Sequence, residues 1–292
     1  MMVLFTKLSL GCIRRAAVLA VFVGMSICLF DQQPVLAQGG DLAVSPTRVV
    51  FEGRKRSAQL SLVNRGSTTS TYRIRIVNMQ MTEDGQMKQI DKAEGGAKFA
   101  SKLFRYSPRQ VTLGPGEAQA VRLLLRKPGN LGEGEYRSHL MMQTVPKDAG
   151  ISIEQEGAQQ GVQIRMVPVF GITIPVIVRH GQTQADVTLT DLKVTPPDAN
   201  SEVPRLQFTI NRAGSSSAFG DLTATLDAGG TKTVIGQVMR LAVYTPNDKR
   251  KVSMALRLPS GTSLSGGKID LSFNKTEDDG GQMIANAGLN LP

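Results

Sequence analysis

The feature that most constrains this chain is an alternation of apolar and polar residues, with a period of two, that recurs from residue 42 to residue 274. For example, Leu60 and Leu62 flank Ser61, and the second half of the chain repeats the pattern. Successive side chains of a strand point to opposite faces, so this period is typical of strands with one face on a core and one in water. The sequence therefore predicts an all-β protein without a long amphipathic helix.

Turn signals separate the predicted strands in the first half of the chain. They are Asn64–Gly66, Glu83–Gly85, Gly114–Gly116 and Gly132–Gly134. Short alternating strands joined by such turns are typical of sandwiches, so we predict two immunoglobulin-like β-sandwich domains in tandem. In the first of them, Tyr136 is predicted to bind the backbone through its hydroxyl, as a tyrosine corner does.

The first 37 residues are predicted to be a signal peptide rather than part of the fold. An apolar run from Ala16 to Phe30 follows three basic residues, and it leads to Pro34 and the small-residue site Val35-Leu36-Ala37. The run is about 15 residues long, whereas a membrane-spanning helix needs roughly 20. We therefore expect cleavage after Ala37, export to the periplasm, and a product that is not an integral membrane protein.

The rest of the chain divides at a polar segment with a glycine, His180–Gln184. We expect an N-terminal immunoglobulin-like domain over residues 38–181 and a C-terminal β-sandwich domain over residues 182–275. Residues 276–292 are acidic, glycine-bearing and then small and polar, so we expect them to form a flexible tail.

The composition disfavours chemistry at a metal or a nucleophile. Both cysteines, Cys12 and Cys28, leave with the predicted signal peptide, so the exported chain has neither a disulfide nor a thiol. The two histidines, His139 and His180, have no second ligand at metal-binding spacing. We therefore predict no catalytic residues, no metal site and no cofactor.

The chain is basic, with a formal charge of +10, of which the first 37 residues carry +2 and leave +8 on the exported part. The basic residues are spread over many predicted strands, and tryptophan is absent. Few aromatic residues disfavour a platform on which bases stack. We therefore predict no nucleic-acid partner.

One segment departs from the pattern of short alternating strands. Val162–Val178 is an apolar run longer than a typical strand, and it carries Pro168 and Pro175. Proline cannot donate a ladder hydrogen bond, so this segment is predicted to lie at a sheet edge or to bulge. An apolar edge is suited to pairing with a strand of another protein, and the residues predicted to bind that client are Val162, Ile164, Met166 and Phe170.

Four motifs in the first half resemble the periplasmic pilus (fimbrial) chaperones of the chaperone–usher pathway, the PapD-like family. The first is the pair Thr47-Arg48, which is followed by an apolar pair and Phe51. The others are an apolar strand that ends in Asn64, the segment Phe104–Gly116, and the segment Gln119–Leu124 around Arg122. The resemblance covers residues 42 to about 180 by motif and the second half by architecture alone.

The resemblance implies a site as well as a fold. In the family, an arginine and a lysine hold the C-terminal carboxylate of a subunit, and the edge strand before the hinge completes the subunit's fold. Arg48 matches the anchoring arginine, whereas Pro175 stands where the family has its lysine. The segment Leu131–Leu140 is only partly similar to the family's. The resemblance therefore implies a carboxylate anchor at Arg48 whose lysine partner is missing.

These observations predict a periplasmic chaperone-like protein, not an enzyme, that binds pilin-like or envelope protein subunits by edge-strand addition (donor strand complementation). An outer-membrane usher is a further candidate partner. The alternative hypothesis is a structural adhesion or surface-appendage component that assembles through the same edge strand. A neighbouring usher gene would favour the chaperone, and so would a monomer or dimer rather than a ladder of polymers on purification.

Overall fold

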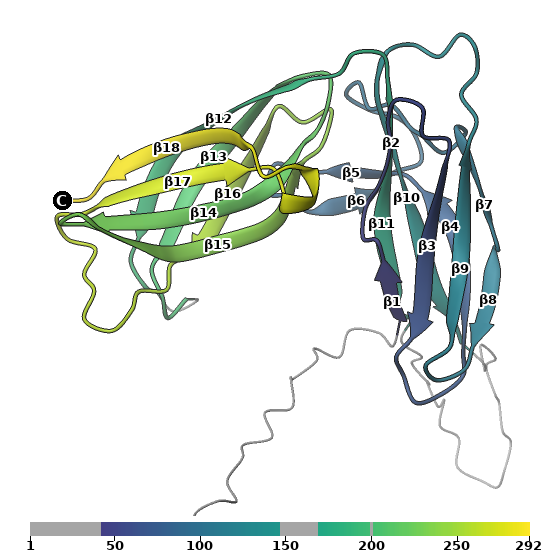
Figure 1. The fold of residues 1–292 in the computed structure, drawn as a ribbon, viewed down its shortest axis with the longest axis horizontal. Helices are drawn as coiled ribbons and strands as arrows, with labels where there is room; N and C mark the ends of the chain where they lie inside the picture. The colour runs from purple at the N-terminus through teal and green to yellow at the C-terminus, as the bar shows by residue number, and fades with distance from the viewer. Residues whose placement is uncertain (1–41, 147–168, 199–200) are drawn as a thin grey trace, which may run out of the picture. The chain divides into compact units, whose positions relative to one another are not determined.

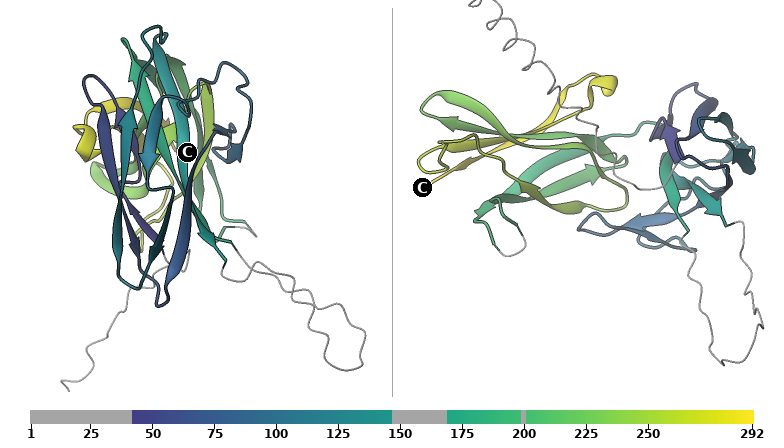
Figure 2. Two further views of the ribbon diagram at one scale, coloured as in Figure 1. Left: turned by 90° about the vertical axis from the view of Figure 1, so that its right-hand side faces the viewer. Right: turned by 90° about the horizontal axis from the view of Figure 1, so that it is seen from below.

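The computed structural model of the chain describes residues 42–146, 169–198 and 201–292. In these ranges the chain is almost entirely β, with eighteen strands and one short 3-10 helix, η1 (Glu277–Asp279) (Figures 1 and 2). None of the helices in these ranges is long and apolar enough to cross a membrane. The residues from Gly40 onward belong to one compact unit. The predicted all-β architecture of two sandwiches is confirmed.

The first sandwich consists of two sheets with the strand orders β1-β3-β9-β7 and β2-β11-β10-β4-β8, and β2 alone runs parallel to its neighbour. Its strands are β1 (Leu42–Ser45), β2 (Val49–Phe51), β3 (Ser57–Asn64), β4 (Ser70–Val77), β7 (Phe104–Ser107), β8 (Gln110–Leu113), β9 (Ala118–Leu125), β10 (Gly134–Val145) and β11 (Gly171–His180). A separate hairpin follows β4 and consists of β5 (Met79–Met81) and β6 (Met87–Gln89).

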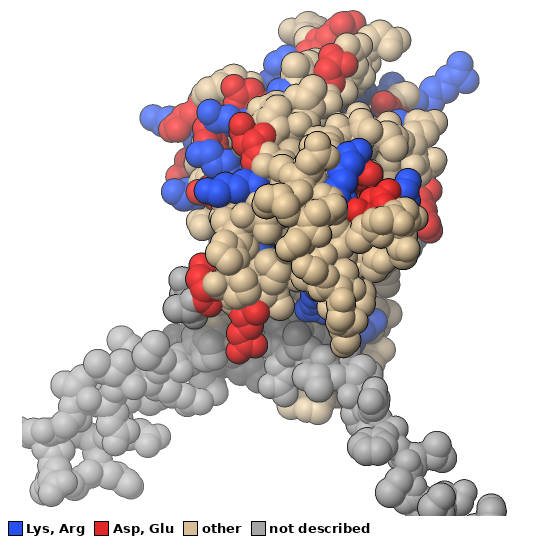
Figure 3. Space-filling model, turned by 90° about the vertical axis from the view of Figure 1, so that its left-hand side faces the viewer, with Lys and Arg blue, Asp and Glu red and all other residues tan. Residues whose placement is uncertain are grey.

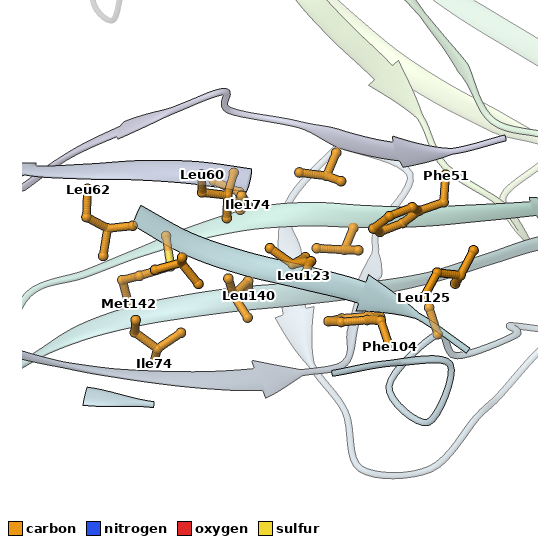
Figure 4. Close-up of a cluster of buried hydrophobic side chains, with 14 of the residues drawn as sticks. Phe51, Leu60, Leu62, Ile74, Phe104, Leu123, Leu125, Leu140, Met142 and Ile174 are labelled. Atoms are coloured by element: carbon orange, nitrogen blue, oxygen red, sulfur yellow. The ribbon is translucent and has the colours of Figure 1, made fainter. Parts of the chain in front are cut away.

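The apolar residues of the alternating pattern fill the space between these two sheets. Leu60 and Leu62 of β3 and Leu123 of β9 are buried in one cluster with Leu140 and Met142 of β10. Figure 4 shows these side chains pointing from the two sheets into the same core. Burial of an apolar side chain of this size stabilises a fold by ~1.5–3 kcal/mol, so this interior holds the first sandwich together without a disulfide.

Two polar side chains fix turns of the first sandwich. The hydroxyl of Tyr136 donates a hydrogen bond of 2.8 Å to the carbonyl of Gly132, which confirms the predicted tyrosine corner. Asn64, at the end of β3, is buried; its amide donates to the carbonyl of Leu113 and accepts from the N–H of Gly66. The asparagine that ends the second motif therefore satisfies backbone groups that water cannot reach.

The second sandwich has the sheets β12-β13-β16 and β15-β14-β17-β18. Its strands are β12 (Ala185–Thr195), β13 (Arg205–Gly214), β14 (Ala218–Ala228), β15 (Thr231–Val243), β16 (Lys249–Ala255), β17 (Lys268–Asn274) and β18 (Met283–Asn290). Alternate residues of β13, β14 and β17 form its core, which includes Leu206, Phe208, Leu222, Leu271 and Phe273. This core is separate from that of the first sandwich.

The expectation of a flexible tail over residues 276–292 is wrong. After η1 the chain forms β18, which pairs antiparallel with β17 from Met283 to Asn290 and is drawn in yellow in Figure 1. Ile284 and Leu289 of β18 pack against the second core. Small polar residues suggest disorder when they are read alone, but β17 offers unpaired backbone groups at its edge, and β18 satisfies them.

Charged residues of both signs are mixed on the surface of the second sandwich. Figure 3 shows a face on which lysine and arginine lie beside aspartate and glutamate, around a broad uncharged area. The positive charge of the chain is therefore not gathered into a single patch on this face.

Candidate functional site

The strand β11 has an open stretch along one of its two edges. On one side it pairs with β10 over its full length, from Gly171 to His180. On the other side it pairs with β2 over Val176–Val178 only. Among the residues that the structure describes, no strand pairs with Gly171–Pro175 on that side. The backbone of this stretch is therefore available to a strand of another chain.

Phe170 lies immediately before this open edge, and its side chain is about half exposed (52 %). Its N–H donates to the hydroxyl of Thr144 at 3.2 Å, and its carbonyl accepts from the N–H of Thr144 at 3.0 Å. The pairing of β10 and β11 thus extends to Phe170. The other predicted client-binding residues, Val162, Ile164 and Met166, lie outside the described residues, and their role stays a prediction.

The register of β2, β11 and β10 puts residues of one face side by side. Val50 of β2 lies beside Ile177 of β11, and Ile177 lies beside Arg137 of β10. Two residues closer to the open stretch of β11, and on the same face, Pro175 pairs with His139. The parallel register of β2, continued by one residue from Val49 and Val176, places Arg48 on the other side of Pro175.

Pro175 is uncharged, so the row that contains Arg48 lacks the cation that the family resemblance implies. A sheet tolerates proline where a strand has a partner on one side only, and β2 begins to pair with β11 at Val176, one residue later. The nearest arginine on the same face of β10 is Arg137, two residues from His139 along the strand. Such diagonal positions on neighbouring strands lie about 7–8 Å apart at their backbones, within reach of long side chains.

This face of the first sandwich is covered by residues of the second sandwich within the same compact unit. Ile177 and Met81 form a buried apolar cluster with Ala242 and Tyr244. Ala242 lies near the end of β15, and Tyr244 directly follows this strand. The amide of Asn247 donates to the carbonyl of Met81 at 2.9 Å. Side chains that the sequence places on a solvent face of β10 and β11 are therefore removed from water.

A carboxylate reinforces this contact. The Glu135 side chain is fully buried and accepts hydrogen bonds from the hydroxyl of Ser217, from the N–H of Ser217 at 3.0 Å and from Nε of Arg179 at 3.1 Å. Arg179 also forms an ion pair of 3.3 Å with the exposed Glu52. The Ser217 hydroxyl in turn accepts from the N–H of Thr245. Both carboxylate oxygens of Glu135 therefore accept hydrogen bonds within this network.

Arg48, the predicted anchor, is largely removed from solvent, with a side chain that is 11 % exposed. Its guanidinium lies 4.2 Å above the centre of the Phe219 ring, and Nη1 is 3.6 Å from the half-exposed carboxylate of Asp279. Its Nε–H is buried and has no hydrogen-bond partner among the described residues. Burial lowers the pKa of Arg48 from its ordinary value, so an anion that reached Nε would restore lost solvation.

Arg137 is more deeply buried, with 5 % of its surface exposed. Its guanidinium stacks 4.2 Å from the centre of the Tyr244 ring, and Nη2 donates to the carbonyl of Thr245 at 3.3 Å. Two further polar atoms, Nε and Nη1, are buried without a partner among the described residues. Burial also lowers the pKa of Arg137. A buried cation with unsatisfied N–H groups is costly, and proteins ordinarily pair it.

Tyr244 stands among three arginines, which we call the arginine cluster: Arg48, Arg137 and Arg250. Burial raises the pKa of Tyr244, while the charges of these three residues act in the opposite direction. Arg250 of β16 donates from Nη1 to the carbonyl of Ala242 at 2.5 Å, and its Nε is buried without a partner among the described residues. The site is thus rich in positive charge and in free donors, which is the arrangement that binds an anion.

His139 lies next to this cluster and is 96 % buried, since 4 % of its surface is exposed. Burial, and secondarily the charge of Arg137, lower the pKa of His139 to about 3. The imidazole is therefore neutral at physiological pH and adds no charge to the site. In the described part of the chain, no group of three or more His, Cys, Asp or Glu residues is placed to hold a metal ion.

Arg212 provides a contrast to the arginine cluster. It is also buried, with 7 % exposed, but its Nε donates to the carbonyl of Asn247 at 2.7 Å and its Nη1 donates to those of Gly214 and Ser216. Its donors serve the fold of the second sandwich. Both Nε and Nη1 of Arg212 therefore donate hydrogen bonds, whereas each arginine of the cluster has at least one buried donor without a partner among the described residues.

Of the residues in and around the arginine cluster, the sequence motifs point to Arg48 alone, and its anchoring role stays a prediction; Arg137, Arg250 and Tyr244 were not predicted. Along β10, Leu140 and Met142 lie on the core face, and Arg137 lies on the opposite face. What covers that face depends on the second sandwich, about which the pattern of β10 says nothing. The one available signal was the sequence Arg137-Ser138-His139, in which two cationic residue types recur at a spacing that puts them on one face.

Comparison with known proteins finds a family model that the first sandwich matches. Residues 41–180 match the family described as "Pili and flagellar-assembly chaperone, PapD N-terminal domain". A curated relative is the probable fimbrial chaperone LpfB of Escherichia coli O157:H7, which is 25% identical over 234 residues, covering 78% of this chain and 91% of the relative.

Solved structures with a similar course of the chain include two chaperones. The YadV chaperone superposes with a TM-score of 0.43 at 14% identity, covering 86% of this chain and 100% of that one. The CupB2 chaperone of Pseudomonas aeruginosa has a TM-score of 0.40 at 13% identity, covering 85% of this chain and 99% of that one. The family match of the first sandwich agrees with the resemblance of its four motifs.

Proposed function

Because residues 41–180 match the family described as "Pili and flagellar-assembly chaperone, PapD N-terminal domain", we propose that this chain is a periplasmic chaperone that binds pilus or envelope subunits by strand addition. The observation that carries the proposal is the open edge of β11 over Gly171–Pro175. Backbone hydrogen bonds along such an edge give affinity, and pockets for alternate side chains give specificity. Residues 1–37, which have the sequence features of a signal peptide, support export.

The side chain next to the edge supports the same function. Phe170 exposes a large apolar surface directly before β11, although its backbone is hydrogen-bonded to β10. An exposed aromatic side chain beside an open edge suits the groove of a subunit that lacks a strand. Val162, Ile164 and Met166, which precede Phe170 at alternating positions, are proposed to extend this contact.

The experiment that tests strand addition is a pull-down from the native periplasm with matched variants. Phe170→Asp places a charge beside the open edge, and we expect it to abolish capture of the client while the fold is retained. Leu124→Asp is the control, because Leu124 is equally exposed (53 %) but lies in β9, which pairs with β3 and β7 on both sides. Equal capture by wild type and Phe170→Asp would refute binding through this edge.

Arg48 is proposed to anchor the client's terminal carboxylate. Its buried Nε–H and its place beside Pro175 support this role. We expect Arg48→Ala to leave the fold nearly unchanged and to weaken client binding by roughly 1.5–3 kcal/mol, the range for a hydrogen bond to a charged group. Two results together would show that Arg48 has a structural role instead: the variant unfolds, and wild-type binding does not depend on the client's C-terminal carboxylate.

The same edge would serve a structural component of an appendage, which is the second candidate function. The family match of the first sandwich favours the chaperone. Size-exclusion chromatography of the purified protein separates the two: a chaperone is a monomer or dimer, and an appendage component forms a ladder of polymers.

A further inference from the structure

We propose that Arg137 of β10 is the second cation of the carboxylate site, and that with Arg48 it holds the C-terminal carboxylate of a bound polypeptide. The inference rests on the proposed function and adds a binding residue to it. It assigns to a strand inside the sheet the role that the family resemblance places on β11, where this chain has Pro175.

The first support is the free hydrogen-bonding capacity of Arg137. Nε and Nη1 are buried and unpartnered among the described residues, whereas Arg212 at similar burial donates from both Nε and Nη1. A guanidinium that only supported the fold would be expected to have its donors satisfied, because an unsatisfied buried donor costs free energy.

The second support is position. Arg137 lies beside Ile177 on β11, on the same face as Pro175 and diagonally across from it. Arg48 lies on the other side of Pro175 by the continued register of β2. Both guanidinium groups act electrostatically on Tyr244, and that of Arg137 lies 4.2 Å from the centre of its ring. The two arginines therefore flank the position at which the expected lysine is missing.

The third support is the charge balance. Of the two carboxylates that act on Arg48, Asp279 is half-exposed at 3.6 Å, and Glu135 is already bound to Ser217 and Arg179. Arg250 adds a third positive charge. It is held under the turn at Gly85, where an added Cβ would lie 2.3 Å from its Nη2. A monovalent anion with two acceptor oxygens would meet the free Nε–H of Arg48 and the free donors Nε and Nη1 of Arg137.

The test uses the side-chain resonances of the arginines. The exported protein is labelled with nitrogen-15, and the Nε–Hε signals of Arg48, Arg137 and Arg212 are assigned with Arg→Lys variants. The probes are an acetylated octapeptide of alternating threonine and valine with a free C-terminal carboxylate, the same peptide with a C-terminal amide, sodium acetate, and inorganic phosphate.

We expect the free-acid peptide to shift the signals of Arg48 and Arg137 saturably and to leave that of Arg212 in place. The amidated peptide should shift neither. A shift of Arg48 without Arg137 would overturn the assignment of Arg137. Equal shifts of the arginine signals with the free-acid and the amidated peptide would overturn the proposal of a carboxylate site. Larger shifts with phosphate than with acetate would overturn it too. Signals that no probe moves at any concentration would overturn the anion site.

A variant pair gives the functional readout. In wild type we expect the free-acid peptide to bind about tenfold or more tightly than the amide. Arg137→Met, which removes the charge, should reduce this ratio several-fold and leave the part that Arg48 contributes, and Arg137→Lys should restore part of the loss. A ratio unchanged in Arg137→Met would refute the proposal.

This design separates the anchor from strand addition. If the β11 edge does not bind a strand, neither peptide binds, and the Phe170→Asp comparison also shows no loss of client. If strand addition is correct and the anchor is wrong, the acid and the amide bind equally well. Should Arg137→Met fail to fold, Arg137→Lys and the wild-type resonances still decide the outcome.

Discussion

Glu135 of β10 accepts hydrogen bonds from both the hydroxyl and the backbone N–H of Ser217, and these bonds tie the first sandwich to the second. The same carboxylate binds Nε of Arg179, which belongs to β11. The strand that carries Arg137 and the strand with the open edge are therefore held by one fully buried side chain. The positions of the proposed anchor and of the edge depend on this contact.

We expect Glu135→Ala to lower the free energy of unfolding by about 3 to 5 kcal/mol, because it leaves a buried N–H and a partly buried arginine without their partner. Urea unfolding measures the loss. Glu52→Ala is the matched control: it removes the other carboxylate of Arg179, which is 60 % exposed, and should cost less than about 1 kcal/mol. Equal losses in the two variants would contradict the role assigned to Glu135.

The stability of the protein should depend on pH through His139. Its pKa is lowered to about 3 in the folded state by burial, against the ordinary value of 6.5. Between these values the unfolded chain binds a proton that the folded chain does not, so stability is fully present above pH 6.5 and is lost as the pH falls toward 3.

From pH 7 to pH 4.5, wild type should therefore lose roughly 2 to 3 kcal/mol more of its unfolding free energy than His139→Phe, which has no titrating ring. Denaturant unfolding at the two pH values measures the difference. His180→Phe controls for the loss of the other histidine. Identical pH dependence in wild type and His139→Phe would show that the imidazole is not held neutral.

Removal of residues 283–292 should destabilise the second sandwich. The deletion unpairs β17 and exposes side chains of the second core to water, at an expected cost of ~3–5 kcal/mol. Hydrogen exchange should show lost protection at Leu271 and Phe273 in β17. The control Met283→Ser changes a side chain that is 63 % exposed and should stay within about 0.5 kcal/mol of wild type. Unchanged protection in the deletion would contradict a structural role for β18.

Close approach of two strands should make Gly220 irreplaceable. A Cβ added at Gly220 of β14 would lie 1.9 Å from the carbonyl oxygen of Asn274, a backbone atom of β17 that cannot move aside alone. We expect Gly220→Ala to cost about 3 kcal/mol in thermal unfolding. At Gly229, where φ is +62° and nothing lies within 4 Å, alanine should cost only about 1 kcal/mol of backbone strain. Similar losses at the two positions would show that β14 can move away from β17.

The sequence by itself determined the all-β class, the period of the strands and the architecture of two sandwiches, but not the last strand, β18. Leu60 and Leu62 could be assigned to the core because the period of a strand is a property of the backbone and needs no knowledge of partners. The corner formed by Tyr136 was predictable because it is a local contact: the tyrosine hydroxyl donates to a carbonyl only four residues earlier. Arg48 was found through a local motif.

The tertiary structure decided what covers each face. Arg137 and His139 carry the polar signature of a solvent face, yet the second sandwich buries both, and only that burial leaves the donors of Arg137 unsatisfied. The order of β18 likewise comes from β17, whose edge pairs with it. Alternation along a strand distinguishes its two faces, but whether the polar face meets water or another domain depends on residues more than one hundred positions away, such as Thr245 beside Arg137.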